Sequence, residues 1–349
     1  MRKILFLTAG PDIVASSRTR VYQFVPYLEK AGFQCRIIPY ESKRSCWENL
    51  NHVKKSIFSK ALNKLYSYLQ ILRFISLASR HDILFIQRVL IPIGLQKFIR
   101  RINDNIFFDF DDALYLNPEK KFIRRLDNLI KESKAVFLEN EFTKEYSSRL
   151  NKNIFVITGP IEVNRYIPSP RGGAKSKVVI GWIGSFGTAE FIKSLKEVLR
   201  ALSDKYENID IHLIGAPNLD LGLRNVSTRE WSLETEVSEL QDFDIGIMPL
   251  LDNDWSRGKG GYKILQYMSI GIPPVASAIG VNTEIIKDGV NGFLVNGRKE
   301  WVDKLSILIE NPELRRSMGA EARKIAVERY SYEAYVPALT AALKGGSGS

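Results

Sequence analysis

The sequence predicts an α/β protein built from two doubly wound, Rossmann-like domains. Short apolar runs of strand length alternate with longer segments of helical periodicity along the chain, and this alternation is typical of βαβ units with parallel sheets. Prolines and glycines interrupt the alternation between Pro160 and Gly173. A chain of 349 residues is also long enough to bury two separate cores.

We therefore expect an N-terminal domain over residues 1–167, a linker over 168–177 and a second domain over 178–328. A helix over 329–344 should return towards the N-terminal domain, and 345–349 is an appended Gly/Ser tail. The expected strands are 4–8, 34–39, 83–87, 106–110, 135–139, 154–157, 178–183, 211–214, 225–228, 244–248 and 274–276. The expected helices are 19–31, 56–79, 93–101, 120–133, 142–150, 189–203, 233–240, 262–270, 300–308, 312–329 and 332–343.

The charge is divided unequally between the two halves. Residues 1–170 hold 28 Lys and Arg against 16 Asp and Glu, whereas residues 171–349 hold 22 against 23. This asymmetry indicates either an anionic partner or a solubilising surface. Basic residues are not interleaved with an aromatic platform, which argues against nucleic acid. Two cysteines and the lack of a long uncharged apolar run favour a cytoplasmic protein.

The strongest motif is a glycine-rich turn that leads into the helix expected from residue 262. The turn contains Gly258, and the cations Arg257, Lys259 and Lys263 lie in or beside it. Glycines let backbone amides approach a ligand, and a helix N-terminus favours negative charge. The turn therefore predicts a diphosphate site, the alternative being a basic surface loop.

Two further features of the second half fit a nucleotide site. Gly184 and Ser185 form a turn between the strand 178–183 and the next helix, where a phosphate or sugar can approach the backbone. Trp231 follows the strand expected over 225–228. Its ring either stacks on a base or packs in the domain core.

Three features of the first half are candidates for contact with substrate or membrane. Arg18 lies at the start of a helix, where a cation is unfavourable, so it binds either an anion or Asp12. Asp111 and Asp112 follow a strand and either bind substrate hydroxyls or accept a proton, or hold a metal. Lys54–Arg80 is a basic amphipathic stretch that lies on an anionic membrane or packs on the sheet.

A family resemblance connects these features. The second half resembles the donor-binding signature of retaining family 4 glycosyltransferases, which have the GT-B fold of two Rossmann-like domains facing each other across a cleft. The residues that carry the resemblance are Gln266-Tyr267-Met268-Ser269, Gly271-Ile272-Pro273-Pro274-Val275-Ala276 and Asn282 to Val295. The sequence departs from the family at its Glu-x7-Glu pair, where Gly258 and Gln266 stand instead. A Gln amide can still hold ribose hydroxyls.

The resemblance implies a cytoplasmic enzyme, peripheral on the inner face of the membrane, that transfers a sugar from a nucleotide-diphosphate sugar during cell-surface polysaccharide or glycolipid synthesis. The acceptor is a saccharide or is lipid-linked, and no metal or other cofactor is expected. A nucleotide-sugar epimerase and a non-catalytic binding subunit stay open as alternatives. The donor residues implied are Gly184, Ser185, Trp231, Arg257, Gly258, Lys259, Lys263 and Gln266; the catalytic ones are Asp111, Asp112 and Lys259, and Arg18 contacts phosphate or acceptor.

Overall fold

The chain forms two compact units in a computed structural model that describes residues 1–50, 53–169 and 176–345. Unit 1 consists of Met1–Pro160, Gly258–Gly260 and Tyr332–Ser349, and unit 2 of Ile161–Arg257 and Gly261–Ser331. Most of the linker expected over 168–177, residues 170–175, lies outside the described residues. All but Gly345 of the tail expected over 345–349 also lies outside them.

Unit 1 is built on a sheet of six parallel strands in the order β2-β1-β3-β4-β5-β6. Its strands are β1 (Arg2–Thr8), β2 (Phe33–Pro39), β3 (Ile83–Gln87), β4 (Ile106–Asp109), β5 (Ala135–Leu138) and β6 (Ile154–Val156). Its helices are α1 (Ala15–Ser17), η1 (Arg18–Tyr22), α2 (Val25–Lys30), α3 (Lys43–Leu50), α4 (Ile57–Ala78), α5 (Ile93–Ile102), η2 (Leu114–Leu116), α6 (Lys120–Glu132), α7 (Glu141–Ser147) and α16 (Tyr332–Leu343).

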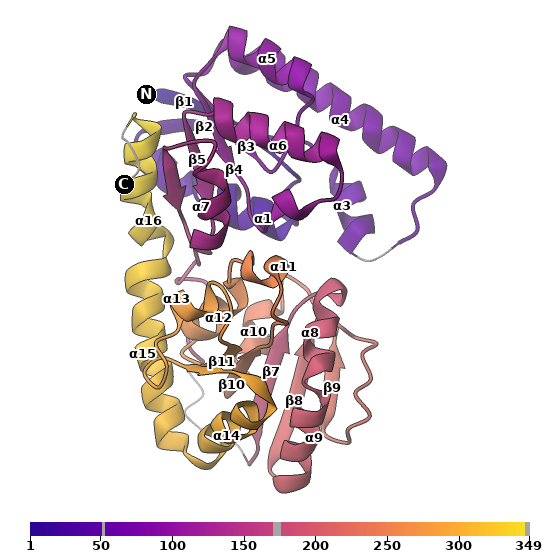
Figure 1. The fold of residues 1–349 in the computed structure, drawn as a ribbon, viewed down its shortest axis with the longest axis vertical. Coiled ribbons are helices and arrows are strands. Elements are labelled where there is room, and N and C mark those ends of the chain that lie inside the picture. The colour runs from indigo at the N-terminus through magenta and orange to yellow at the C-terminus, as the bar shows by residue number, and fades with distance from the viewer. Residues whose placement is uncertain (51–52, 170–175, 346–349) are drawn as a thin grey trace. The chain divides into compact units, whose positions relative to one another are not determined.

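Helices cover both faces of this sheet (Figure 1). Alternate strand residues belong to separate buried clusters, since Leu84 packs with α4, α5 and α6 whereas Phe85 packs with α2 and α16. This division follows from the period of two along a strand. The C-terminal helix α16 thus belongs to unit 1, where Tyr332 stacks on Tyr27 and bonds to the carbonyl of Thr19.

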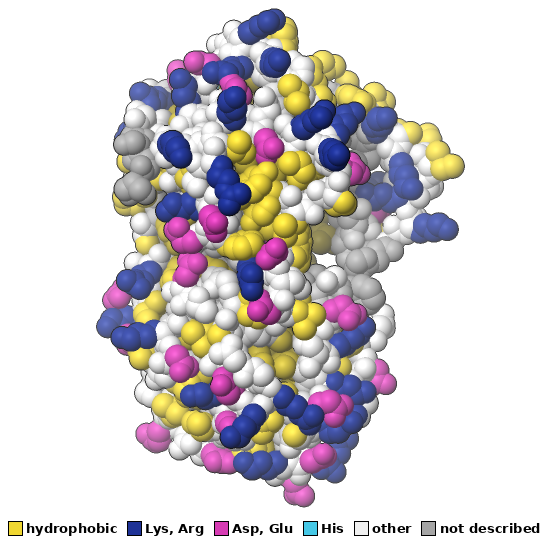
Figure 2. Space-filling view, viewed as in Figure 1, with side chains coloured by type: hydrophobic (Ala, Val, Ile, Leu, Met, Phe, Trp, Pro, Cys, Tyr) yellow, Lys and Arg dark blue, Asp and Glu magenta, His cyan; other side chains and the backbone are white. Residues whose placement is uncertain are grey.

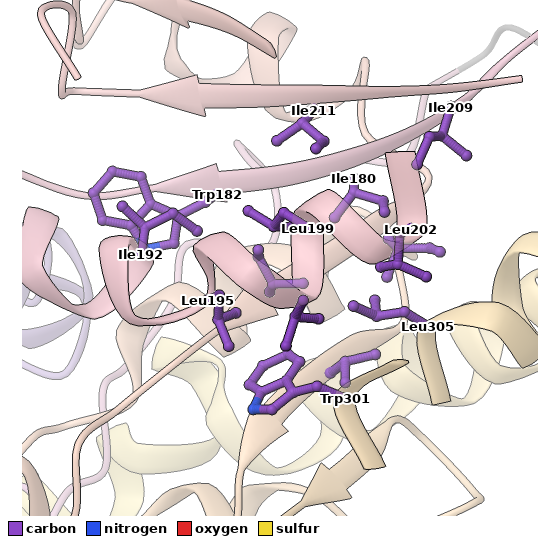
Figure 3. Packing of buried hydrophobic residues seen from close by; sticks show 14 of the residues in the cluster. Ile180, Trp182, Ile192, Leu195, Leu199, Leu202, Ile209, Ile211, Trp301 and Leu305 are labelled. Atoms are coloured by element: carbon purple, nitrogen blue, oxygen red, sulfur yellow. The ribbon is translucent and has the colours of Figure 1, made fainter. Parts of the chain in front are cut away.

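Unit 2 repeats the plan with the parallel order β12-β11-β10-β7-β8-β9. Its strands are β7 (Val178–Ile183), β8 (Ile209–Ile214), β9 (Val226–Arg229), β10 (Ile245–Met248), β11 (Pro274–Ser277) and β12 (Phe293–Val295). Its helices are η3 (Phe186–Thr188), α8 (Ala189–Ser194), α9 (Lys196–Lys205), α10 (Glu236–Leu240), α11 (Asp254–Arg257), α12 (Tyr262–Ser269), α13 (Asn282–Ile285), α14 (Gly297–Glu310) and α15 (Pro312–Tyr330). Trp182 on β7 and Trp301 on α14 are both buried in its core (Figure 3).

The predicted α/β class with two parallel sheets is confirmed, but some elements differ from expectation. The helix expected over 19–31 is divided into the π-helical turn η1 and α2. Pro26 lies in the first turn of α2, where its missing amide donor costs nothing and favours a new helix start. The helix expected over 189–203 is divided at Leu195. The elements α3, α11, α13 and β12 were not predicted from the sequence.

Candidate active site

A cluster of charged side chains lies at the carboxyl edge of the unit 1 sheet. Arg88 follows β3, Asp111 and Asp112 follow β4, and Glu139 follows β5. Because β3, β4 and β5 are adjacent and parallel, these side chains leave the sheet at the same edge. The two aspartates were predicted from the sequence, but Arg88 and Glu139 were not. Arg88 directly follows the predicted strand 83–87, and Glu139 ends the predicted strand 135–139; these positions were the signal that could have found them.

Asp111 and Asp112 are held by Arg88. The Arg88 Nη1 atom lies 2.5 Å from Asp111 Oδ1, and Nη2 lies 3.6 Å from Asp112 Oδ2. Arg88 and Asp112 both have left-handed backbone, with φ of 58° and 54°. That conformation costs energy for residues with a Cβ, and such strain concentrates at functional sites. The structure therefore fixes this ion cluster at some energetic cost.

Asp109 has a different role from its two neighbours. It is buried and accepts hydrogen bonds from Arg20 Nε at 3.0 and 3.2 Å. Burial lowers the pKa of Arg20, but the charge and hydrogen bonds of Asp109, with the charges of Glu139 and Asp111, together raise it by more, so the guanidinium stays protonated. Arg20 also donates to the carbonyl of Ile157. The pair thus joins η1 to the sheet and is structural.

Lys259 belongs to the same cluster, because Gly258–Gly260 is part of unit 1. Its Nζ atom lies 3.1 Å from Asp112 Oδ1, and its carbonyl accepts a hydrogen bond from the buried Asn140. A Cβ on Gly258 would lie 2.5 Å from the Cβ of Ala113. A Cβ on Gly260 would lie 1.9 Å from Glu139 Oε2. Glycine on both sides of Lys259 is therefore what lets this loop lie against Ala113 and Glu139.

Glu139 has a strongly perturbed carboxyl group. Burial raises its pKa to about 8, and the nearby aspartates add to the effect, while Arg20 opposes it from 3.9 Å. A protonated carboxyl at neutral pH can donate a hydrogen bond or exchange a proton. Burial also raises the pKa of Asp111, which Arg88 opposes.

The second group of predicted residues lies in unit 2 around the hydroxyl of Tyr166. Gln266 donates to that hydroxyl from Nε2 at 3.3 Å, and the hydroxyl donates to the Glu236 carboxylate. Trp231 donates to the other Glu236 oxygen from Nε1 at 2.6 Å. Burial, with Tyr262 and Glu236 nearby, raises the pKa of Tyr166 well above 10. Since its only proton points to Glu236, Tyr166 can only accept from residue 266.

This hydrogen-bond network holds two of the predicted site residues, Gln266 and Trp231. Gln266 is buried and its amide serves as a donor inside the protein, a role that a carboxylate cannot fill. Trp231 is half-buried and held by its indole nitrogen, so it is not part of the domain core. Glu236 and Tyr166 were not among the predicted site residues. Sequence analysis could not pair Tyr166 with Gln266 because the two are 100 residues apart.

Gly184 and Ser185 form the turn after β7, as their sequence suggests. The amide of Ser185 donates to Thr188 Oγ1, and Lys263 Nζ lies 3.4 Å from the same oxygen. Lys263 also lies 4.7 Å from the centre of the Trp182 ring. A Cβ on Gly184 would lie 2.2 Å from that ring, so glycine is required here. The first turn of α12 thus brings a cation to the Gly-Ser turn of the same unit.

The remaining predicted cations have partners of their own. Arg257 is exposed and lies 2.9 Å from Asp252 and 3.4 Å from Asp254. Arg18 is buried, and its Nη1 donates to the backbone carbonyl of Asp12, not to the carboxylate that the sequence suggested. Arg257, Lys259 and Lys263 therefore have different contacts in this structure, and their joint phosphate role stays a prediction. Among the described residues, no group of three or more His, Cys, Asp or Glu could hold a metal ion.

Comparison with known proteins finds a similarity in the second half of the chain. Residues 177–311 match the model of the family described as Glycosyl transferases group 1. This segment, about two fifths of the chain, is therefore similar to group 1 glycosyl transferases. The chain is also 24% identical over 168 residues to trehalose synthase of Pyrococcus horikoshii, a match that spans 42% of this chain and 39% of the relative.

Solved structures extend the fold assignment to the whole chain. Sucrose-phosphate synthase from Thermosynechococcus elongatus superposes with a TM-score of 0.73 at 11% identity, over 99% of this chain and 98% of that one. Anabaena HepE in complex with UDP-glucose superposes with a TM-score of 0.74 at 16% identity, over 99% and 100%. The chain therefore has the GT-B fold that the sequence predicted, and the segment similar to group 1 glycosyl transferases forms part of it.

Proposed function

We propose that this chain transfers a sugar from a nucleoside-diphosphate donor to an acceptor, with retention of anomeric configuration as in family 4. The observation that carries the proposal is the match of residues 177–311 to the family described as Glycosyl transferases group 1. That segment contains the Gly-Ser turn and Lys263, which the structure brings together. A cation beside backbone amides at a helix start is suited to a diphosphate.

For the donor, we propose that Lys263 and the turn at Gly184 and Ser185 bind the phosphates. Gln266 uses its amide NH₂ on Tyr166, which leaves its carbonyl oxygen to accept from a ribose hydroxyl. Trp231, fixed through Glu236, offers its ring to a base. UDP is the first nucleotide to test, because it is the donor nucleotide in the Anabaena complex.

For the acceptor, we propose unit 1 with Asp111 and Asp112. Carboxylates that are fixed by Arg88 can accept hydrogen bonds from sugar hydroxyls and help to remove the acceptor proton. Saccharides of cell-surface polysaccharide or glycolipid fit the excess of positive charge in residues 1–170, because such acceptors are often anionic or membrane-bound. Arg18 stays a predicted contact for such an anion.

The reaction should not need a metal ion. We propose that Lys259, Lys263 and Arg257 neutralise the leaving diphosphate, whose charge grows in the transition state. Turnover in a chelator should then equal turnover in added Mg²⁺ or Mn²⁺. A rate that disappears in chelator and returns with the metal would contradict this part of the proposal.

Thermal unfolding with UDP, GDP, ADP and uridine tests the donor site. A ligand at 100 times its Kd stabilises the folded form by about 2.7 kcal/mol. For a domain of this size we expect a rise in Tm of about 5–10 °C for one diphosphate and little for uridine. No shift with any diphosphate would contradict a donor site in unit 2.

The fate of the donor distinguishes the enzyme classes. Incubation with the nucleotide sugar that binds should release the nucleoside diphosphate, slowly to water and faster to an acceptor. The anomeric proton of the product, observed by NMR, reports retention. An isomerised nucleotide sugar would indicate an epimerase, and binding without any turnover would indicate a binding subunit.

A further inference from the structure

Helix α4 has two apolar faces, and only one of them is used by the core of unit 1. Its inner face places Ile71, Phe74 and Ala78 in the cluster beneath the helix. Its outer face exposes a row of large apolar side chains to solvent, with exposed fractions of 72% at Phe58, 46% at Leu62, 56% at Leu65, 53% at Leu69 and 62% at Leu72. Packing on the sheet therefore explains the inner face but leaves the outer row unexplained.

The outer residues form one continuous stripe. Their spacing alternates between four and three residues, which keeps them on one face of a helix with about 3.6 residues per turn. Figure 2 shows hydrophobic side chains mixed with Lys and Arg over the α4 end of unit 1. We call the set Phe58, Leu62, Leu65, Leu69 and Leu72 the α4 stripe.

Neighbouring helices extend the apolar surface with aromatic side chains. Helix α3 is joined to the start of α4 by the hydrogen bond of Ser59 to Glu48, and it exposes Trp47 by 54%. Helix α5 contacts α4 and exposes Phe98 by 47%. Aromatic rings of this kind favour the boundary between headgroups and acyl chains.

The charge around the stripe has one sign. Residues 54–80 contain six Lys and Arg and no Asp or Glu. At about 100° per residue, Arg73 lies on one flank of the stripe and Lys64 on the other. Both are exposed. A stripe framed by cations alone is complementary to an anionic surface.

A second copy of α4 is a poorer partner for the same face. Stripes of this spacing can pair as coiled coils, but pairing there relies on opposite charges beside the seam. Two α4 helices would bring Lys and Arg against Lys and Arg. In the described part of the chain no helix is long and apolar enough to span a membrane. The stripe is suited to a helix that lies in the surface of a bilayer.

We propose that the α4 stripe, with Trp47 and Phe98, docks unit 1 on the surface of a membrane that contains anionic lipid. The apolar row enters the headgroup boundary, and Lys64 and Arg73 contact lipid phosphates. This proposal does not depend on the proposed transferase activity, since it concerns only binding of the chain to lipid.

Cosedimentation of the full chain with vesicles tests the proposal. Vesicles of phosphatidylcholine with 30% phosphatidylglycerol should bind the chain at least tenfold more strongly than vesicles of phosphatidylcholine alone, and salt should weaken this binding. Leu65→Gln with Leu69→Gln should reduce binding at least tenfold. The matched control is Ile307→Gln with Val327→Gln, two apolar residues exposed on unit 2 helices, which should bind like the wild type.

The charges are tested separately. Lys60→Gln, Lys64→Gln and Arg73→Gln together should reduce binding to the anionic vesicles more than a hundredfold, at about fivefold for each charge. Lys287→Gln, Lys299→Gln and Lys324→Gln remove the same net charge from unit 2 and should have little effect.

Three results would overturn the proposal. The first is equal binding of the wild type and the Leu65/Leu69 variant to anionic vesicles. The second is no binding to those vesicles. The third is a dimer in solution that the Leu65/Leu69 variant converts to a monomer, which would make a second copy the occupant of the stripe. Circular dichroism melts should confirm that every variant is folded.

Discussion

Glu139 lies at the end of β5 against three aspartates, and burial raises its pKa to about 8. In the unfolded chain a glutamate loses its proton near pH 4.5. Between these two values the folded chain holds more protons than the unfolded one. Rising pH therefore lowers the free energy of unfolding there, by up to about 1.4 kcal/mol per pH unit.

Glu139→Gln should remove this pH dependence. Relative to the wild type, the variant should gain stability from pH 5 to pH 8, by about 1 kcal/mol per pH unit, because its side chain is neutral throughout. Urea unfolding at pH 5, 6.5 and 8 measures the difference. Glu145→Gln on the exposed side of α7 is the control and should show no such trend. A constant difference across this range would mean that Glu139 is ionised in the folded chain.

The fit of Gln266 at its buried position depends on its amide donating a hydrogen bond to the Tyr166 hydroxyl. Gln266→Glu would place a second carboxylate on the Tyr166 hydroxyl, whose proton already serves Glu236. We expect a loss of about 1–3 kcal/mol of stability in unit 2 and weaker nucleotide binding. Chemical denaturation and nucleotide titration measure the two effects.

Exchanging the two side chains should restore the network. In Gln266→Glu with Glu236→Gln, the new amide accepts from Trp231 and donates to Tyr166, which then donates to the new carboxylate. The double variant should be at least about 1 kcal/mol more stable than the sum of the single changes predicts. Additive effects would show that Tyr166 does not link the two positions.

Two contacts hold Lys259: its ammonium pairs with Asp112, and its backbone carbonyl accepts a hydrogen bond from Asn140. Lys259→Ala leaves Asp112 within 3.6 Å of Arg88, so the fold should survive. If the ammonium stabilises the leaving diphosphate, turnover should fall about 100-fold, and Arg257→Ala should also reduce it. Initial rates of donor turnover give the result, with Lys287→Ala as the control. Wild-type rates in both variants would remove these residues from the site.

At the scale of elements, the loop Gly258–Gly260 depends on the absence of side chains. Gly258→Ala would press a methyl group against Ala113, 2.5 Å from its Cβ and 2.9 Å from its amide nitrogen. We expect a loss of about 1–3 kcal/mol, measured by urea unfolding, and lower turnover because Lys259 moves. Gly94→Ala is the control, since nothing lies within 4 Å of its added Cβ on α5. It should be neutral or slightly stabilising.

Element boundaries show where local sequence signals compete with tertiary contacts. The strand at 83–87 and the helix at 332–343 were predicted to the residue, because apolar periodicity and flanking polar residues agree there. The helix expected over 19–31 was wrong as one element. Its arginines have the propensity for a regular helix, but Arg20 must reach Asp109, 89 residues away. That pairing coincides with the π-helical turn η1.

At the scale of the whole molecule, two separate cores predict two separate responses to a ligand. If unit 2 binds the nucleotide by itself, UDP should raise the unfolding temperature of unit 2 directly. Scanning calorimetry of the full chain, with Trp182 and Trp301 fluorescence as added probes for the unit 2 core, should show a ligand-dependent transition. If UDP raised the midpoint temperature of every unfolding transition equally, the two units would instead unfold together.

The sequence by itself determined the fold class and most strands of both parallel sheets, because these depend on periodicity and on glycine and proline at turns, which are local properties. It also pointed to Asp111, Asp112, Lys259 and Gln266 as individual residues. Only the tertiary structure decided their partners. Lys259 meets Asp112 across 147 residues, and Gln266 meets Tyr166 across 100. The pKa of Glu139 and the exposure of the α4 stripe were likewise decided by folding, since burial and charge pairing depend on contacts between distant segments.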